Sequence, residues 1–306
     1  MAEILDCLVI GGGPAGLTAA LYLGRFRRSV TVIDKGWSRA EWITLSHNLP
    51  GFPEGLSGPG LLDRLRTQAR RYGALLYDGV VETLAHGTDG LFTAQTADTT
   101  LRARTVILAT GVVENKPPLA HLADAVKSGR VRTCPICDGY ENQDKRVAVL
   151  GAGEHAAAEA LFLRTYTDRL TLLLPLGASP LSPKTQQALD MAGIAVDHLV
   201  IGSVGLDEHG VTAVIAEDGR AQTFDVVYSA FGTSPQTALG RTLGAMIDAA
   251  GRLYVSEHQE TSIEGLFAAG DLVRGLNQIS VAEGEAAIAA TAAHNHLARV
   301  SSSSDA

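Results

Sequence analysis

The sequence predicts an α/β protein with two domains, each a parallel sheet covered by helices on both faces. Two glycine-rich turns carry this prediction, one at residues 11–16 and one at residues 151–156. Each turn follows a short apolar run and opens a segment of helical character. This order is typical of a Rossmann-like nucleotide-binding unit. A chain of 306 residues has the length of two such three-layer domains.

The composition favours a folded enzyme or binding protein over several other classes. Hydrophobic residues make up 46% of the chain, which is enough apolar material for a buried core. The net charge is −8, and no run of Lys or Arg interrupts it, so we expect no binding to nucleic acid or to anionic membranes. No apolar stretch reaches the roughly 18 residues of a membrane helix. With three cysteines and no basic signal segment at the start, we expect a cytoplasmic protein and not a disulfide-stapled secreted scaffold.

The first domain begins with a buried apolar strand that enters the first glycine turn. A helix follows the turn, and a second strand ends in Asp34. A Pro- and Gly-rich segment then predicts an extended loop before a strongly amphipathic helix. The expected strands are 4–10, 30–33 and 105–109, the expected helices are 14–27 and 61–72, and the expected loop is 44–60.

The second glycine turn repeats the order of strand, turn and helix. Near the end of the chain, a short apolar strand precedes an alanine-rich helix. The serine-rich tail 301–306 has no apolar anchor, so we expect it to be disordered. The expected strands are 147–150, 170–174, 226–230 and 266–269, and the expected helices are 154–166 and 281–298.

The first glycine turn matches the Gly-x-Gly-x-x-Gly pattern of dinucleotide binding. Gly11 permits the tight turn, Gly13 lets the backbone approach a pyrophosphate, and Gly16 lets the helix pack closely on the strand. The N-terminus of the helix offers N–H groups to phosphates. Asp34 ends the next strand, where a carboxylate binds ribose hydroxyls, and this context disfavours a plain glycine turn. The predicted cofactor-binding residues here are Gly11, Gly13, Pro14, Ala15, Gly16, Asp34 and Lys35.

A Cys-x-x-Cys motif lies at Cys134 and Cys137. Such a pair can close a redox-active disulfide or supply half of a zinc site. The sequence favours redox chemistry and no metal, because the remaining cysteine, Cys7, lies inside the first strand and belongs to the core. Asp138 follows the second cysteine, where an acid could move protons during thiol exchange. Its alternative interpretation is a helix-capping carboxylate.

The second glycine turn has the geometry of a further dinucleotide fold, with Ala156 at the third glycine position. The strand after it ends at Leu174, and no base or acid follows before Lys184. A site for NADPH normally has basic residues there, and a site for NADH an acid. Glu154 also lies in the turn, where its charge would oppose a pyrophosphate.

A second carboxylate, Asp271, follows a strand end at Gly270 and precedes a helix that begins near residue 278. It could hydrogen-bond the sugar-like chain of a cofactor, and the helix N-terminus could stabilise negative charge on the ligand. Strand-end aspartates also cap helices, so the motif alone is weak. The residues concerned are Gly270, Asp271, Gln278, Ile279 and Ser280.

Taken together, these motifs resemble the low-molecular-weight thioredoxin reductase family over nearly the whole chain. The resemblance lies in the order of its features as well as in each one. In chain order, the features are the Gly11–Gly16 turn, the loop Asn48-Leu49-Pro50-Gly51-Phe52-Pro53, the strand end Ala109-Thr110-Gly111, the segment Cys134–Asp138, and Phe267-Ala268-Ala269-Gly270-Asp271.

The resemblance implies an FAD-binding domain made of residues 1–115 and 246–306. An NAD(P)H-type domain, residues 116–245, would be inserted in it and would carry the cysteine pair. Cys137 would face the flavin and react with it, Cys134 would attack the substrate disulfide, and Asp138 would act as acid and base. The resemblance further implies a homodimer, with thioredoxin or another small disulfide as substrate. The implied flavin contacts are Asn48, Ala109, Thr110, Gly111, Asp271, Gln278 and Ile279.

Two departures from the family pattern bear on the electron donor and on the flavin. The family's His-Arg-Arg for the NADPH phosphate is absent after Leu174, and its Gly-Gly-Gln segment is replaced by residues 37–42. The leading hypothesis is therefore a thioredoxin reductase-like flavoenzyme with NADPH as an uncertain donor. One alternative keeps the flavin and the cysteines but takes electrons from a ferredoxin-type protein, or passes electrons from a dithiol to oxygen. A second alternative is a flavin redox sensor without turnover.

Overall fold

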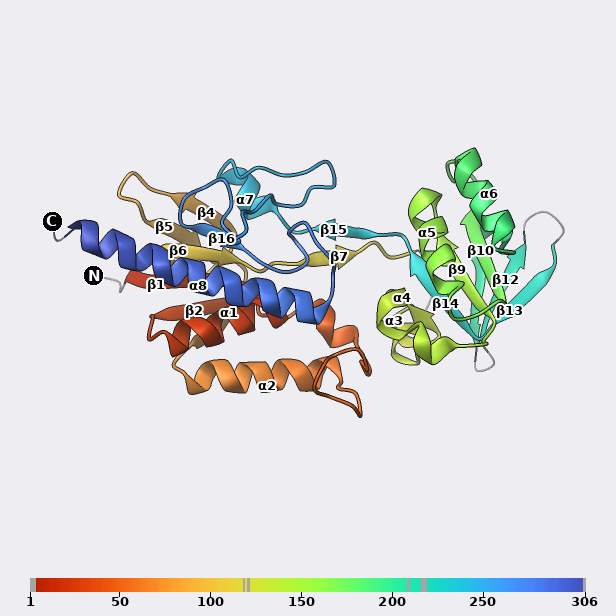
Figure 1. Cartoon of the computed structure of the whole chain (residues 1–306), viewed down its shortest axis with the longest axis horizontal. Coiled ribbons are helices and arrows are strands. Elements are labelled where there is room, and N and C mark those ends of the chain that lie inside the picture. Colours follow the sequence, from red (N-terminus) through yellow and green to blue (C-terminus); the bar gives the residue numbers. More distant parts are fainter. Residues whose placement is uncertain (1–3, 118, 120–121, 208–209, 216–218, 305–306) are drawn as a thin grey trace. The chain divides into compact units, whose positions relative to one another are not determined.

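The computed structural model describes residues 4–117, 119, 122–207, 210–215 and 219–304. Its internal contacts divide the chain into two compact units (Figure 1). The first unit comprises Met1–Leu45, Leu49–Val113 and Ser234–Ala306, and the second comprises Ser46–Asn48 and Glu114–Thr233. Each unit is an α/β structure around its own seven-stranded sheet, so the predicted fold class is confirmed.

The first unit has a sheet of order β3-β2-β1-β6-β5-β4, with β16 paired to β6. Strands β1, β2, β3, β6 and β16 run parallel, and β4 and β5 add an antiparallel edge. The strands are β1 Ile4–Ile10, β2 Val30–Asp34, β3 Leu75–Asp78, β4 Thr83–His86, β5 Phe92–Gln95, β6 Thr100–Leu108 and β16 Leu266–Ala268. The helices are α1 Pro14–Arg25, η1 Arg39–Trp42, α2 Gly58–Arg71, α7 Ala238–Thr242 and α8 Ile279–Ser304.

Both faces of this sheet are buried, which explains why residues 7–10 of β1 are all apolar and do not alternate with polar residues. Cys7 and Val9 pack toward α1 and α8, whereas Leu8 and Ile10 belong to the cluster on the other face. Helix α8 lies beside α1 (Figure 1) and contributes a row of buried alanines to their common core. These small side chains let the two helices approach the sheet closely.

The second unit has the strand order β13-β12-β11-β10-β9-β14-β8, with β8 to β11 and β14 parallel. Strands β7 Val112–Glu114 and β15 Thr233–Pro235 pair with each other where the chain passes between the units. The other strands are β8 Val131–Arg132, β9 Val147–Gly151, β10 Leu170–Pro175, β11 Ala195–Asp207, β12 Gly210–Ile215, β13 Ala221–Phe224 and β14 Val226–Ala230. The helices are α3 Leu122–Lys127, α4 Pro135–Asp138, η2 Tyr140–Asn142, α5 Gly153–Leu163 and α6 Pro183–Met191.

Two details differ from the sequence-based expectations. The second domain boundary, expected after residue 245, falls after Thr233, because Leu239, Leu243 and Ala245 pack into the core of the first unit. The prediction that the tail is disordered is wrong for residues 301–304, because α8 continues to Ser304. Residues 305–306 lie outside the described part of the chain. Extending an existing helix adds one hydrogen bond per residue without a new nucleation cost.

No helix in the described part of the chain has the length and apolar character needed to span a bilayer.

The first glycine turn sets the approach of α1 to β1. A Cβ atom on Gly16 would lie 1.8 Å from the carbonyl oxygen of Gly11, a backbone contact that no rotamer change can relieve. We expect Gly16→Ala to lower the free energy of unfolding by about 1–3 kcal/mol through overpacking, as measured by urea denaturation. The matched control is Gly284→Ala in α8, where a Cβ would meet no atom within 4 Å. It should stabilise the protein by about 0.5–1 kcal/mol, and equal effects of the two substitutions would contradict the packing argument.

Candidate functional site

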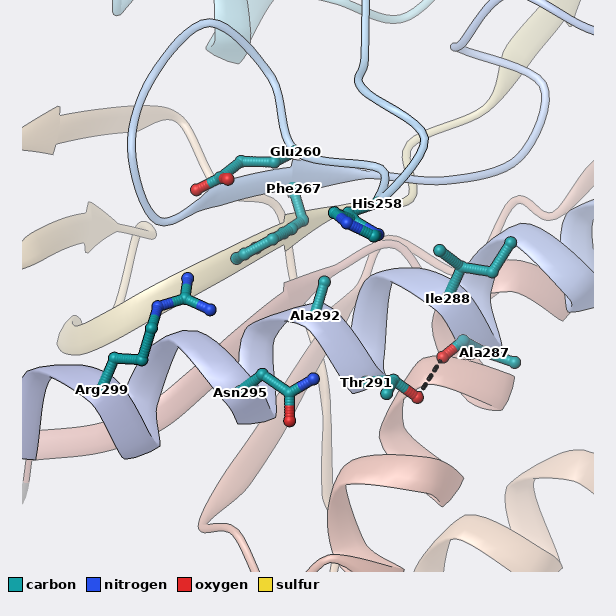
Figure 2. Close-up of a pocket in the computed structure, with 9 residues that line it drawn as sticks. All are labelled: His258, Glu260, Phe267, Ala287, Ile288, Thr291, Ala292, Asn295 and Arg299. Carbon is teal, nitrogen blue, oxygen red and sulfur yellow. Dashed lines mark hydrogen bonds between the residues drawn. The ribbon is translucent and has the colours of Figure 1, made fainter.

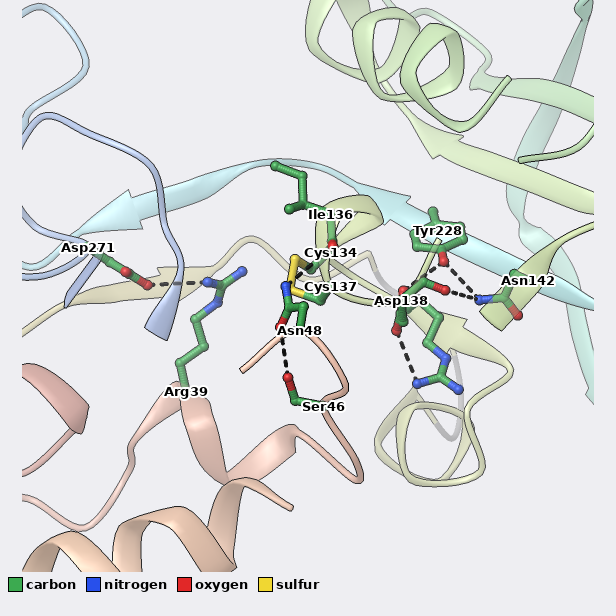
Figure 3. The surroundings of a disulfide bond; sticks show 11 residues. Arg39, Ser46, Asn48, Cys134, Ile136, Cys137, Asp138, Asn142, Tyr228 and Asp271 are labelled. Carbon is green, nitrogen blue, oxygen red and sulfur yellow. Dashed lines mark hydrogen bonds and ion pairs between the residues drawn. A yellow bond between two sulfur atoms is a disulfide. The ribbon is translucent and has the colours of Figure 1, made fainter. Parts of the chain in front are cut away.

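Cys134 and Cys137 form a disulfide bond in the second unit (Figure 3). The short helix α4 begins with the buried Pro135, directly after the first cysteine, and the Cys137 N–H donates to the carbonyl of Cys134 at 3.0 Å. The predicted redox pair is therefore brought together by one helical turn, with a Cα–Cα distance of 5.3 Å. Among the residues that the structure describes, no group of three His, Cys, Asp or Glu side chains is placed to hold a metal ion.

Cys7, the third cysteine, is fully buried in β1. Burial raises the pKa of its thiol to about 12, so it stays protonated at neutral pH. Its interpretation as a core residue is confirmed.

Asp138 ends α4, and its carboxylate is bound by two side chains. The Tyr228 hydroxyl donates to Oδ1 at 2.7 Å, and the Arg132 guanidinium lies 3.1 Å from Oδ2. Burial raises the pKa of Asp138, and these two partners act against that rise. The helix-capping interpretation finds no support, since the N-terminus of α4 has no side-chain cap and the carboxylate faces Tyr228 and Arg132.

Asn48 lies in the same compact unit as the two cysteines, because the contacts of residues 46–48 group them with the second unit. Its Oδ1 accepts a hydrogen bond from the Ser46 hydroxyl at 2.8 Å. Its Nδ2 donates at 3.4 Å to the carbonyl of Ile136, the residue between proline and the second cysteine (Figure 3). Asn48 thus contacts the backbone of the redox motif itself.

The first glycine turn has the conformation that the sequence predicts. Gly11 has a φ of +113°, and a Cβ there would lie 2.3 Å from the carbonyl oxygen of Ala109. Helix α1 starts at Pro14, and no side chain caps its N-terminus. Asp34 stands at the end of β2, where its Oδ1 accepts from the Gly36 N–H at 3.1 Å. An uncapped helix N-terminus and a strand-end carboxylate are thus present in one unit.

Other predicted contacts of the first unit also lie at strand ends. Thr110 donates from its hydroxyl to the carbonyl of Gln236 at 2.5 Å, and the Gln236 N–H donates to the carbonyl of Gly111. Gly111 has a φ of +62°, a conformation that favours glycine. The Lys35 ammonium lies 6.0 Å from the centre of the Trp37 ring.

The Gly270–Asp271 corner of the first unit contains partners that sequence reasoning missed. The Gly270 N–H donates to Oε2 of Glu285 at 2.8 Å, and Oδ2 of Asp271 pairs with Nη1 of Arg39 at 3.2 Å. Burial raises the pKa of both carboxyl groups. Arg39 comes from the segment that departs from the family pattern, so no motif pointed to it. Helix α8 begins at Ile279, after Gln278, and Ser280 lies in its first turn.

The second glycine turn differs from its sequence-based interpretation in the position of Glu154. Its carboxylate accepts from the Ser182 N–H at 2.7 Å and from the Thr185 hydroxyl, at the start of α6. These hydrogen bonds lower the pKa of Glu154, so its charge is held at the positive end of α6 and is partly balanced there. At the next residue of α5, Nε2 of His155 lies 3.1 Å from Oε1 of Glu159, and this contact raises the pKa of His155.

A separate pocket of about 450 Å³ lies in the first unit between α8 and the segment before β16 (Figure 2). Phe267 lines it, with His258 and Glu260 from the loop and Asn295 and Arg299 from the helix. None of the predicted site residues lines this pocket. The candidate chemistry therefore lies at the glycine turns and at the cysteine pair.

Comparison with known proteins agrees with this geometry. Residues 5–286 match the model of the pyridine nucleotide-disulphide oxidoreductase family. The chain belongs to that family. The thioredoxin reductase of Listeria innocua is 30% identical over 311 residues, which cover 96% of this chain and 94% of the relative.

Solved structures of the family support the same assignment. A thioredoxin reductase from Streptococcus pyogenes superposes with a TM-score of 0.88 at 26% identity, covering 98% of this chain and all of the other. The atypical thioredoxin reductase TRi from Desulfovibrio vulgaris Hildenborough is 35% identical, with a TM-score of 0.55 and coverage of 96% and 98%. The predicted resemblance to the low-molecular-weight thioredoxin reductases is confirmed, and with it the activity class of a thiol-disulfide oxidoreductase.

The hydrogen bonds of Glu154 tie the start of α6 to the second glycine turn. We expect Glu154→Gln to weaken this tie, so that the Ser182 amide exchanges its hydrogen faster, as measured by hydrogen exchange with mass spectrometry. Ala158→Gln is the matched control, because Ala158 is exposed on the same helix. Unchanged exchange at Ser182 in the Glu154 variant would show that the carboxylate does not hold the loop.

Proposed function

We propose that this chain is an FAD-dependent thiol-disulfide oxidoreductase in which the Cys134–Cys137 bond is reduced and re-formed in each cycle. The observation that carries the proposal is the disulfide itself, closed within a nucleotide-type unit and followed directly by a buried carboxyl group. The insertion of this unit between the two parts of the first unit also fits the family's arrangement. Catalytic roles are proposed for Cys134, Cys137 and Asp138.

FAD is proposed to bind in the first unit. The residues there fit it, because the uncapped N-terminus of α1 offers N–H groups to a pyrophosphate. The side chain that any other residue would carry at Gly12 would collide with the Asp34 carboxylate, only 2.2 Å from such a Cβ. The bare backbone thus leaves Asp34 beside the turn, where it can accept ribose hydroxyls. Asp271, Gln278 and Ile279 are proposed to hold the ribityl chain and the ring edge.

The cysteines divide the chemistry between them in this proposal. FAD, when bound, supplies two electrons to the disulfide. Cys137 is proposed to face the flavin, and Cys134 to attack the substrate as a thiolate. Thiol exchange passes through a mixed disulfide, so the second cysteine must stay within bonding reach of the first. One turn of α4 keeps it there.

The substrate is proposed to be thioredoxin or another small disulfide protein, because several relatives of this chain are named thioredoxin reductases. A homodimer is proposed on the resemblance to the same family.

The electron donor separates the leading function from a second candidate. Strand β10 ends at Pro175, and the segment up to Lys184 has no basic residue for a 2′-phosphate. The lack of basic residues favours an electron donor other than NADPH, such as a ferredoxin-type protein. It equally fits a reaction in the opposite direction, in which the enzyme oxidises a dithiol and passes the electrons to oxygen. Both candidates use the same flavin and cysteines.

The two cysteines should fail in different ways when replaced. Cys137→Ser should abolish turnover and leave FAD bound, whereas Cys134→Ser should leave the flavin reducible but block the disulfide substrate. Flavin absorbance and single-turnover kinetics measure both effects, and each variant serves as the control of the other. Loss of FAD from the Cys137 variant, or continued turnover by the Cys134 variant, would contradict these roles.

An anaerobic titration identifies the donor. The yellow protein is treated with NADPH, then NADH, then a dithiol and dithionite, while the visible flavin band is followed. We expect little bleaching by NADPH, because β10 lacks phosphate-binding cations, and full bleaching by dithionite. Rapid, stoichiometric bleaching by NADPH would instead favour the NADPH-dependent thioredoxin reductase.

A further inference from the structure

Two side chains outside any recognised motif hold the carboxyl group of Asp138. The Tyr228 hydroxyl donates to Oδ1 at 2.7 Å (Figure 3). Nη1 of Arg132 lies 3.1 Å from Oδ2. Both oxygens are therefore bound, each by a different partner. The side chain of Asp138 is 16% exposed and that of Arg132 26% exposed, so water screens this pair only in part.

The sheet of the second unit determines this placement. Arg132 and Tyr228 are register partners in the parallel pair of β8 and β14, so both side chains leave the sheet on the same face. Arg132 stands two residues before the first cysteine, and its Nε also donates to the carbonyl of Gly129 at 3.0 Å. Its guanidinium is thus anchored at one side while it meets Asp138 at the other.

A buried amide completes the arrangement. Nδ2 of Asn142 donates to the backbone carbonyl of Asp138 and to the Tyr228 hydroxyl oxygen, both at 2.9 Å. Its Oδ1 accepts from the ammonium of Lys145 at 3.0 Å. Since the hydroxyl accepts one hydrogen bond from Asn142, its own proton is left to point at Asp138.

The charges around Asp138 act in opposite directions. Burial and the nearby Glu141 raise the pKa of the Asp138 carboxyl, while Tyr228 and Arg132 lower it. Burial and the Asp138 charge raise the pKa of Tyr228 far above its ordinary value, so this phenol remains a donor throughout the working pH range. The Arg132 guanidinium supplies a positive charge within ion-pair distance of the carboxylate.

We propose that Arg132 and Tyr228 are positioning residues that orient the Asp138 carboxyl and favour its charged form, so that it can exchange a proton with the cysteine pair near neutral pH. The inference rests on the proposed function, because it assigns a proton carrier to the disulfide chemistry stated there. It adds two residues from outside the cysteine motif to that site.

Reduction of the Cys134–Cys137 bond takes two electrons, which the flavin would supply when bound, and two protons, and gives two thiols. The Cys134 thiol passes its proton to the Asp138 carboxylate and attacks the substrate disulfide, and the leaving substrate sulfur takes that proton from Asp138. The Cys137 thiol then gives its proton to Asp138 and attacks Cys134, which re-forms the protein disulfide. The second substrate sulfur leaves and takes the proton from Asp138, which returns to its charged form.

The test measures how fast dithiothreitol reduces the Cys134–Cys137 bond in the anaerobic full-length holoprotein between pH 5 and 9. Samples are quenched in acid, and free thiols are counted by alkylation and mass spectrometry. The variants are Arg132→Gln, Arg132→Lys and Tyr228→Phe. The control is Arg146→Gln, which breaks an ion pair with Asp225 in the same unit and leaves the Arg132–Asp138 pair in place. Dividing each rate by that of the control removes the titration of dithiothreitol itself.

We expect the rate of Arg132→Gln, relative to the control, to change with pH at a midpoint about one unit higher than in the native protein, since loss of a neighbouring cation raises a carboxyl pKa. Tyr228→Phe should move the midpoint in the same direction, and Arg132→Lys should restore it. Asp138→Asn should abolish the midpoint.

A relative rate that falls equally at every pH would show that Arg132 and Tyr228 have only a structural role, and would overturn the proposal. A midpoint that survives in Asp138→Asn would overturn it too. If Arg132→Gln fails to fold, Tyr228→Phe, which removes one hydroxyl, decides the question alone. The assay needs no electron donor and no substrate protein. A lack of disulfide turnover would therefore refute the proposed function while this profile still decided the positioning role.

Discussion

The contact of backbone with backbone at the two glycine turns is the constraint on which both units depend. At Gly16 the helix lies against the carbonyl of Gly11, and at Gly151 a Cβ would meet both Ala230 and Ala156. Only a residue without a side chain allows the strand, the turn and the helix to meet this closely. The result in each unit is a helix whose N-terminus points at the carboxyl ends of parallel strands, where ligands of such folds bind.

The two units use this common geometry differently. In the first, the N-terminus of α1 is left without a side-chain cap, and Asp34 stands beside it at the end of β2. In the second, the carboxylate of the turn residue Glu154 is drawn away to the start of α6, and β10 ends without a base. The same fold therefore presents an uncapped helix end beside a carboxylate in one copy, and a strand end without basic residues in the other.

The cysteine pair depends on the sheet of the second unit for more than its position. A disulfide across one helical turn needs only the spacing of its cysteines, but proton transfer needs an acid with a defined charge. The register of β8 against β14 brings Arg132 and Tyr228 to the same carboxyl group. The cysteines and one partner of Asp138 thus come from the segment that follows and includes β8, whereas the second partner comes from β14, and strand pairing brings them together.

The fold class, the two glycine turns, the redox pair and the core role of Cys7 could be predicted from the sequence, because each depends on local spacing and periodicity. It also gave the order of motifs by which the family is recognised. The partners of the charged groups emerged from the folded structure and not from any motif: Arg39 with Asp271, Glu154 with Ser182, and Arg132 with Asp138. These pairs join residues from separate elements, most of them distant in sequence. No local pattern encodes them, since strand register and helix packing set which side chains meet.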